Sequence, residues 1–241
     1  MASLSKVHRD GWGLAVFDER TGWQVERGLG CAFEDARFHS LAVGSRGSAL
    51  VSHIRQRTVG DTTIQNTHPF ARGRWVFAHN GTLIDLEWVR RRVAGDRIAE
   101  VQGATDSELL FAWILTELDQ RGATETPANK VTDTALRAVV GAARSHEGLG
   151  SINFLLSDGV TTYANRFGRT MFVLERRAAS FDLPRTSAHA LVDGEQPCLT
   201  GCVSVLVASE RMTDESWEEI GDGTLVRIER NPSPRWWIVA D

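Results

Sequence analysis

Two helical patterns stand next to each other in the middle of this chain, and predicted strands fill the sequence on both sides of them. The first helix begins at a capping box, Thr105-Asp106-Ser107-Glu108, and continues as an apolar stripe at helical spacing. The second helix covers about 130–146. Because strands and helices do not alternate regularly, a doubly wound parallel sheet is disfavoured. The order of the elements predicts a layered α+β fold.

Most of the remaining chain is predicted to form strands. Residues 11–17 and 22–27 predict a hairpin. A short helix is expected at 86–93, and Thr213 could cap one helical turn at 213–217. The sequence has no internal repeat and no low-complexity linker, which favours a single domain over residues 1–241. The other expected strands are 48–54, 75–79, 151–157, 161–166, 171–175, 202–209, 224–229 and 236–239.

The composition disfavours several classes of partner. The 241 residues carry a formal net charge of −4 and no long basic run, which argues against nucleic-acid binding. No apolar run reaches membrane-spanning length, and residues 1–8 lack an apolar signal core, so we expect a cytoplasmic protein without membrane contact. The cysteines Cys31, Cys198 and Cys202 are too few and too scattered for a disulfide framework or a metal site. We predict no metal ion and no cofactor.

The segment from Trp75 to Leu83 carries informative polar residues. Its apolar run ends in Ala78-His79-Asn80-Gly81, which predicts a core strand followed by a tight turn. An Asn side-chain amide beside a Gly N–H offers the neutral donors that an oxyanion hole needs. A plain hairpin turn would use the same residues, so the neighbouring motifs must decide between the two interpretations.

Further polar clusters interrupt the apolar segments. Structural explanations exist for each of them: Asp10-Gly11 is a common turn sequence, Arg55 could be a surface cation, and Asp106 could merely favour a helix N-terminus. The clusters lie at 8–13, 53–60 and 104–108.

Together, the clusters describe a pocket for one kind of ligand. Arg55 offers a planar fork for a carboxylate, with the Thr58 hydroxyl as a nearby donor, and Asp106 can accept from an ammonium group. Asn80 and the Gly81 N–H can hold a tetrahedral oxyanion. A ligand with a carboxylate and an ammonium at one end and a carbonyl at the other is an α-amino acid with an amide side chain. Glutamine or a γ-glutamyl compound satisfies this description.

At these residues the chain resembles the class II glutamine amidotransferases, whose fold is that of the N-terminal-nucleophile hydrolases. It is most similar to the stand-alone branch that includes the γ-glutamyl hydrolase of ergothioneine biosynthesis. The similarity extends more loosely through 153–159 and 215–217, so it covers nearly the whole chain. It rests on segments that occur in the family's order, namely His8–Gly13, His53–Gly60, Asn66–Phe70, Ala78–Leu83 and Thr105–Leu110.

The resemblance implies a four-layer αββα sandwich and a role for each site residue. Arg55 would hold the substrate α-carboxylate, Asp106 its α-amino group, and Asn80 with Gly81 the oxyanion. The family's nucleophile is a cysteine at the N-terminus of the mature chain, whereas residue 2 here is Ala. We therefore expect the nucleophile and the opening strand of the sandwich to be absent, which would leave a neighbouring strand with an unpaired edge.

Other residues are poor replacements for the missing nucleophile. Cys31 cannot supply an α-amine, and Ser3 or Ser5 would need proteolytic exposure. The histidines of the polar clusters are expected to be buried and hydrogen-bonded rather than general bases; they are His53, His68 and His79.

Two functions follow from this sequence. The first is hydrolysis of the side-chain amide of glutamine or a γ-glutamyl compound through a Cys thioester in a full-length form, with this shortened chain inactive. The alternative is a non-catalytic glutamine- or γ-glutamyl-binding pseudoenzyme or regulatory subunit. A true amidotransferase role would require a separate ammonia-using partner enzyme.

Overall fold

The computed structural model describes residues 8–177 and 203–240. The helices are α1 (Ala36–Gly44), α2 (Leu86–Arg90), α3 (Gly95–Ala99), α4 (Asp106–Asp119) and α5 (Lys130–Ser145). The strands are β1 (Gly11–Asp18), β2 (Gly22–Gly28), β3 (Ala49–Arg55), β4 (Phe70–Arg72), β5 (Trp75–Leu83), β6 (Gly150–Ser157), β7 (Thr161–Arg166), β8 (Phe172–Arg176), β9 (Ser204–Ala208), β10 (Glu218–Glu219), β11 (Thr224–Glu229) and β12 (Arg235–Ile238).

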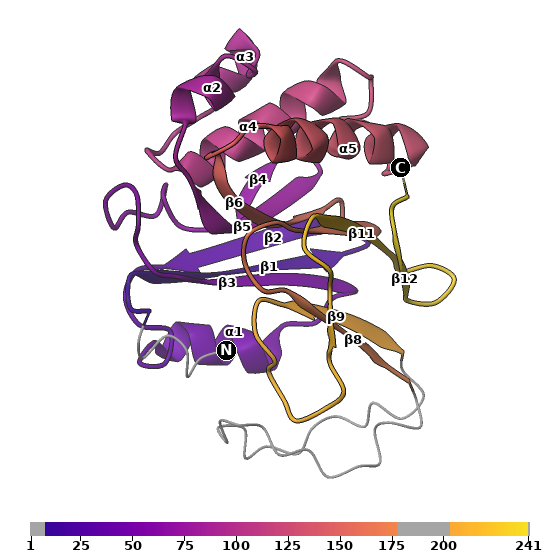
Figure 1. The fold of residues 1–241 in the computed structure, drawn as a ribbon. Coiled ribbons are helices and arrows are strands. Elements are labelled where there is room, and N and C mark those ends of the chain that lie inside the picture. The colour runs from indigo at the N-terminus through magenta and orange to yellow at the C-terminus, as the bar shows by residue number, and fades with distance from the viewer. Residues whose placement is uncertain (1–7, 178–202, 241) are drawn as a thin grey trace.

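A six-stranded antiparallel sheet lies in the middle of the molecule, in the order β12-β11-β7-β6-β5-β4. Helices α4 and α5 cover one of its faces (Figure 1). Two three-stranded sheets, β2-β1-β3 and β10-β8-β9, cover the other face. Helix α1 packs on the outer side of β1 and β3. This arrangement confirms the predicted α+β sandwich with αββα layers.

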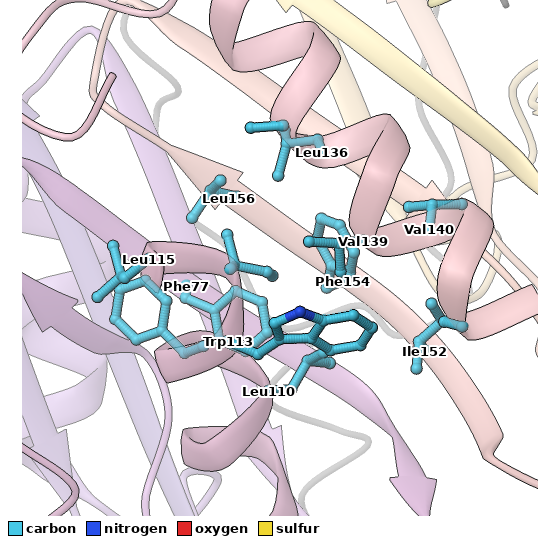
Figure 2. Close-up of a cluster of buried hydrophobic side chains, with 14 of the residues drawn as sticks. Phe77, Leu110, Trp113, Leu115, Leu136, Val139, Val140, Ile152, Phe154 and Leu156 are labelled. Carbon is cyan, nitrogen blue, oxygen red and sulfur yellow. The ribbon is translucent and has the colours of Figure 1, made fainter. Parts of the chain in front are cut away.

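The two central helices form where the sequence predicts them, because each has a capped start and an apolar face. Thr105 caps α4 by accepting the Glu108 N–H, and Asn129 forms a capping box with Thr132 at the start of α5. The apolar side chains of both helices meet those of β5 and β6 in one core, part of which Figure 2 shows. Trp113 and Phe154 of this core are each only 1% exposed.

On the opposite face of the six-stranded sheet, the apolar interior is divided into two clusters. One cluster lies beneath β1 and β3 and includes Val51 and Ala78. The other lies beneath β8 and β9 and includes Val173 and Val226. Leu155 of β6 packs at the border of both clusters and stays partly exposed. The layer that covers this face is therefore open above Leu155.

The sequence predictions differ from the structure at a few elements. Helix α1 was not predicted, because its short segment lacks a long apolar stripe; Asp35 caps it by accepting N–H groups from Arg37 and Phe38. The helical turn expected at 213–217 is wrong. The Trp217 indole N–H donates to the Thr213 hydroxyl there (3.0 Å), and the backbone forms a bend. Across 8–177 and 203–240, every helix is too short or too polar to cross a membrane.

Candidate active site

Asn80 and Gly81 lie inside β5 rather than on a turn after it. The strand continues to Leu83, and Asn80 pairs with Asn153 of β6 while Gly81 pairs with Ile152. The expectation of a tight turn is therefore wrong. Backbone pairing with β6 keeps the Asn-Gly pair extended. Asn80 shares its face of β5 with Ala78, so its side chain is directed to the interior between the sheets.

His79 connects this part of β5 to the start of α4 and to β6. Its ring is 2% exposed, with Nε2 3.0 Å from the Ser151 carbonyl oxygen and Nδ1 2.9 Å from Ser107 Oγ. A carbonyl can only accept, so Nε2 carries the proton and the Ser107 hydroxyl donates to Nδ1. A Cβ atom at Gly81 would lie 2.4 Å from His79 Nε2 and 2.1 Å from the Ser151 oxygen. Glycine is therefore required beside this histidine.

Asp106 is the first residue of α4 and is 3% exposed. Its Oδ2 accepts the Leu83 N–H at 2.7 Å, which fixes the carboxylate beside the end of β5. Its Oδ1 has only a long contact, 3.4 Å, with Ser107 Oγ. One carboxylate oxygen thus keeps the capacity to accept from another donor, such as an ammonium group.

Arg55 ends β3 and is 4% exposed. Its guanidinium donates to the carbonyl oxygens of Asp61 (3.0 Å), Val59 (3.1 Å) and Gly60 (3.2 Å). Burial lowers the pKa of Arg55, but an arginine still remains a cation. These three bonds leave the other N–H donors of the guanidinium for a ligand. Thr58 lies in the same loop and is exposed.

The loop that Arg55 holds is also bonded to the start of α4. Asn66 donates to the Asp61 carbonyl oxygen (2.9 Å) and accepts the Ala104 N–H (2.8 Å), and it is 4% exposed. Sequence reasoning used Asn66 only as part of a family segment and gave it no role. The signal was an uncharged polar residue a few residues before β4.

The first polar cluster joins the same region. The Asp10 carboxylate accepts the Arg57 N–H at 2.8 Å, next to the Arg55 loop. A Cβ atom at Gly13 would lie 2.0 Å from the His68 carbonyl oxygen, so glycine allows these two backbones to touch. The structure therefore brings all of the predicted polar clusters to one end of the sandwich.

His68 is buried and His53 is half-buried, and both differ from the expectation of full hydrogen bonding. The rings of His53 and His68 lie 4.3 Å apart, and both ring nitrogens of His68 and Nδ1 of His53 have no hydrogen-bond partner. Burial lowers the pKa of His53 to about 4 and lowers the pKa of His68 well below its ordinary value. Both rings are therefore neutral near pH 7 and do not compete with Arg55 for an anion.

Cys31 lies in the segment between β2 and α1. It is 7% exposed and precedes Ala32, which packs with Trp12 and Phe38 beneath α1. Cys198 and Cys202 lie outside the described residues. Within the described ranges, no three or more His, Cys, Asp or Glu side chains are arranged to hold a metal ion.

Comparison with known proteins identifies the family. Residues 2–235 match the family model of class II glutamine amidotransferases. YafJ of Escherichia coli is 30% identical over 235 residues, which cover 90% of this chain and 83% of YafJ. The γ-glutamyl-hercynylcysteine sulfoxide hydrolase of Mycobacterium tuberculosis is 28% identical over 227 residues, which cover 92% of this chain and 76% of that enzyme.

Solved structures agree on the fold. A glutamine aminotransferase class-II domain protein from Silicibacter pomeroyi has a TM-score of 0.61 at 22% identity, covering 96% of this chain and 92% of that one. The glutamine phosphoribosylpyrophosphate amidotransferase of Bacillus subtilis has a TM-score of 0.61 at 15% identity; the match covers 99% of this chain and 45% of that enzyme. The αββα sandwich and the matched family model agree, and this chain belongs to the class II glutamine amidotransferases.

Proposed function

We propose that this chain binds glutamine, or the γ-glutamyl part of a larger compound, through Arg55 and Asp106. One observation carries the proposal: the two residues belong to one hydrogen-bonded unit. Arg55 holds the loop at 59–61, and Asn66 ties that loop to Ala104, beside the start of α4. A cation and an anion are thus positioned before a ligand arrives, which lowers the cost of ordering them on binding.

The unused hydrogen-bonding capacity of the unit suits an α-amino acid. The remaining Arg55 donors match an α-carboxylate, and Asp106 Oδ1 matches an ammonium group. Thr58 is exposed in the same loop and is the proposed hydroxyl donor. Because the charges of the ligand and of the site cancel pairwise, burial of the ligand leaves no charge unpaired.

We further propose that a form with an N-terminal cysteine hydrolyses the side-chain amide. The thiolate would attack the amide carbon, and the carbonyl electron pair would move to oxygen, where Asn80 and Gly81 stabilise the charge. The N-terminal α-amine would take the thiol proton and pass it to the departing nitrogen, so that collapse breaks the C–N bond, releases ammonia or an amine, and leaves a thioester that water hydrolyses to the acid. In the cytoplasm, a separate ammonia-using enzyme would turn this hydrolysis into amide transfer.

The position of Cys31 does not suit a replacement nucleophile. Its thiol is buried beside Ala32 beneath α1, and a residue inside the chain has no free α-amine. As the alternative, we propose a single domain over residues 1–241 that binds its ligand as a pseudoenzyme or regulatory subunit without hydrolysing it.

Calorimetric titration of the purified chain with L-glutamine and with a γ-glutamyl dipeptide tests the binding proposal. We expect saturable binding that Asp106→Asn weakens at least about tenfold, which corresponds to about 1.4 kcal/mol. Arg55→Lys, which keeps the charge but loses the fork, should weaken binding as well. Asp96→Asn, on the exposed start of α3, is the matched control and should bind normally. No heat from either ligand with a folded preparation would overturn the proposal.

The catalytic part is tested separately. Ammonia release from glutamine should be absent for this chain and should appear in a form that starts with cysteine, if the upstream reading frame encodes one. Treatment with a glutamine-mimicking electrophile, followed by mass spectrometry, locates any nucleophile. A covalent adduct on Cys31 or on a serine of this chain would contradict the assignment of a silent site.

A further inference from the structure

The Ser107 hydroxyl lies between two buried acceptors at the start of α4. Its Oγ is 2.9 Å from Nδ1 of His79 and 3.4 Å from Oδ1 of Asp106. All three side chains are at most 4% exposed. A hydroxyl carries one hydrogen, so it can make a full hydrogen bond to only one of these acceptors at a time. The state of His79 therefore decides whether Asp106 Oδ1 receives this hydrogen.

Two features keep Nδ1 of His79 as the acceptor. The Ser151 carbonyl oxygen, 3.0 Å from Nε2, accepts the ring proton, which leaves Nδ1 with its lone pair. Burial lowers the pKa of His79 despite the opposing effect of the Asp106 carboxylate, so the ring is neutral near pH 7. Nδ1 thus takes the Ser107 hydrogen, and the longer contact with Asp106 carries none.

Asp106 depends on this arrangement because its other carboxylate oxygen is already engaged. Oδ2 accepts the Leu83 N–H at 2.7 Å. If the Ser107 hydrogen turned to Oδ1, both oxygens would be bonded to the protein, and an incoming ammonium group would compete with one of those bonds. With the hydrogen on His79, Oδ1 keeps its lone pairs for a ligand.

We propose that His79 is a positioning residue for ligand binding, and that it acts by drawing the Ser107 hydroxyl hydrogen away from Asp106. The inference rests on the proposed function, in which Asp106 receives the ammonium group of glutamine or of a γ-glutamyl compound. The His79 ring lies on the helix side of β5, opposite to the side chain of Asn80, so it affects the ligand through Ser107 and Asp106 rather than by contact.

A double-mutant cycle, measured by calorimetric titration with L-glutamine, tests this proposal on the purified chain. His79→Leu removes the acceptor, so the Ser107 hydrogen turns to Asp106, and binding should weaken about tenfold. In the background of Ser107→Ala there is no hydrogen to turn. Adding His79→Leu to that background should therefore change the affinity by less than about threefold.

Ser145 provides the matched control serine. It lies on α5, is exposed, and donates to the Gly141 carbonyl oxygen at 2.9 Å. Adding Ser145→Ala to His79→Leu should leave the loss of affinity as large as before. His79→Asn is the conservative variant, because its amide oxygen can accept from Ser107 in place of Nδ1, and it should weaken binding less than His79→Leu does.

Nitrogen NMR of the histidine rings tests the premise without any substitution or ligand. In the unaltered chain near pH 7, the proton of His79 should be on Nε2, with Nδ1 unprotonated. A proton on Nδ1 would overturn the inference, and this holds even where His79→Leu does not fold.

The titrations distinguish this inference from the proposed function on which it rests. If the unaltered, folded chain binds neither L-glutamine nor a γ-glutamyl dipeptide, both fail together. If the chain binds and His79→Leu costs the same affinity with and without the Ser107 hydroxyl, the role of His79 is merely structural and only this inference fails. Unchanged affinity in folded His79→Leu would have the same consequence.

Discussion

The two faces of the six-stranded sheet are covered in different ways. On the helix-covered face, Phe77, Phe154 and Leu156 are at most 1% exposed and belong to one continuous core. On the opposite face, Leu155 is partly exposed between two smaller clusters. The helix-covered face therefore contributes most of the apolar burial, whereas the opposite, open face is covered by two smaller sheets with a gap above Leu155. We expect substitutions on the two faces to have effects of different size and kind.

The largest effect is expected for Phe154→Ala on the helix-covered face. Phe154 is 1% exposed and packs beside Phe77, with ring centroids 5.7 Å apart. Truncation leaves a cavity in a close-packed core, so the free energy of unfolding should fall by about 3–5 kcal/mol. Urea unfolding followed by tryptophan fluorescence measures the change. A loss below about 1 kcal/mol would show that the helices cover this face less tightly than the structure indicates.

Acid should destabilise the protein by protonating His53 of β3. Burial lowers the pKa of His53 to about 4, whereas an unfolded histidine titrates near 6.5. The unfolded state therefore binds the proton more readily. The stability from this group is fully present above about pH 6.5 and is lost as the pH falls toward 4, by about 2–3 kcal/mol in total.

Urea unfolding across this pH range measures the acid effect, and His53→Gln should make the dependence shallower. His68 adds to the same trend, because burial also lowers its pKa. A pH dependence that stays the same in both His53→Gln and His68→Gln would assign the acid sensitivity to other groups.

A smaller effect is expected for Leu155→Ala, the neighbour of Phe154 on the opposite face. Leu155 is already partly exposed, so truncation removes less buried surface, and water can fill the space that it leaves. The free energy of unfolding should fall by about 1–2 kcal/mol in the same urea assay. A loss as large as that of Phe154→Ala would contradict a covering layer that is open above Leu155.

Local sequence patterns predicted most of the elements, since their signals lie within the segments themselves. The capping residues Thr105 and Asn129 mark the starts of α4 and α5, and the expected strands at 161–166 and 224–229 match β7 and β11. Helix α1 escaped prediction because its stability comes from tertiary contacts, including the Trp12 indole, which donates to the capping residue Asp35 at 2.8 Å.

The sequence names the candidate site residues by type, and their roles stay predictions, but it does not give their geometry. Nothing in the local sequence reveals that Arg55 uses part of its guanidinium on its own loop, or that Asn66 joins that loop to Ala104. The Asn66 bond to Ala104 joins segments 38 residues apart in the sequence, and the Arg55 bonds depend on how its loop folds back. The Asn80-Gly81 pair has the composition of a turn, and only the pairing with β6 keeps it extended.

The smallest effect is expected for two exposed ion pairs, one on each side of the molecule. They test whether surface charge contributes to the difference in stability between the two faces. Glu87 pairs with Arg91 on α2, and Glu34 pairs with Arg9 in the outer layer; all four side chains are more than half exposed. Water and salt screen such pairs, so Glu87→Gln and Glu34→Gln should each change the free energy of unfolding by less than about 0.5 kcal/mol. Urea unfolding at low and high salt measures both. If either variant lost as much stability as Leu155→Ala, surface charge as well as apolar cover would distinguish the stability of the two faces.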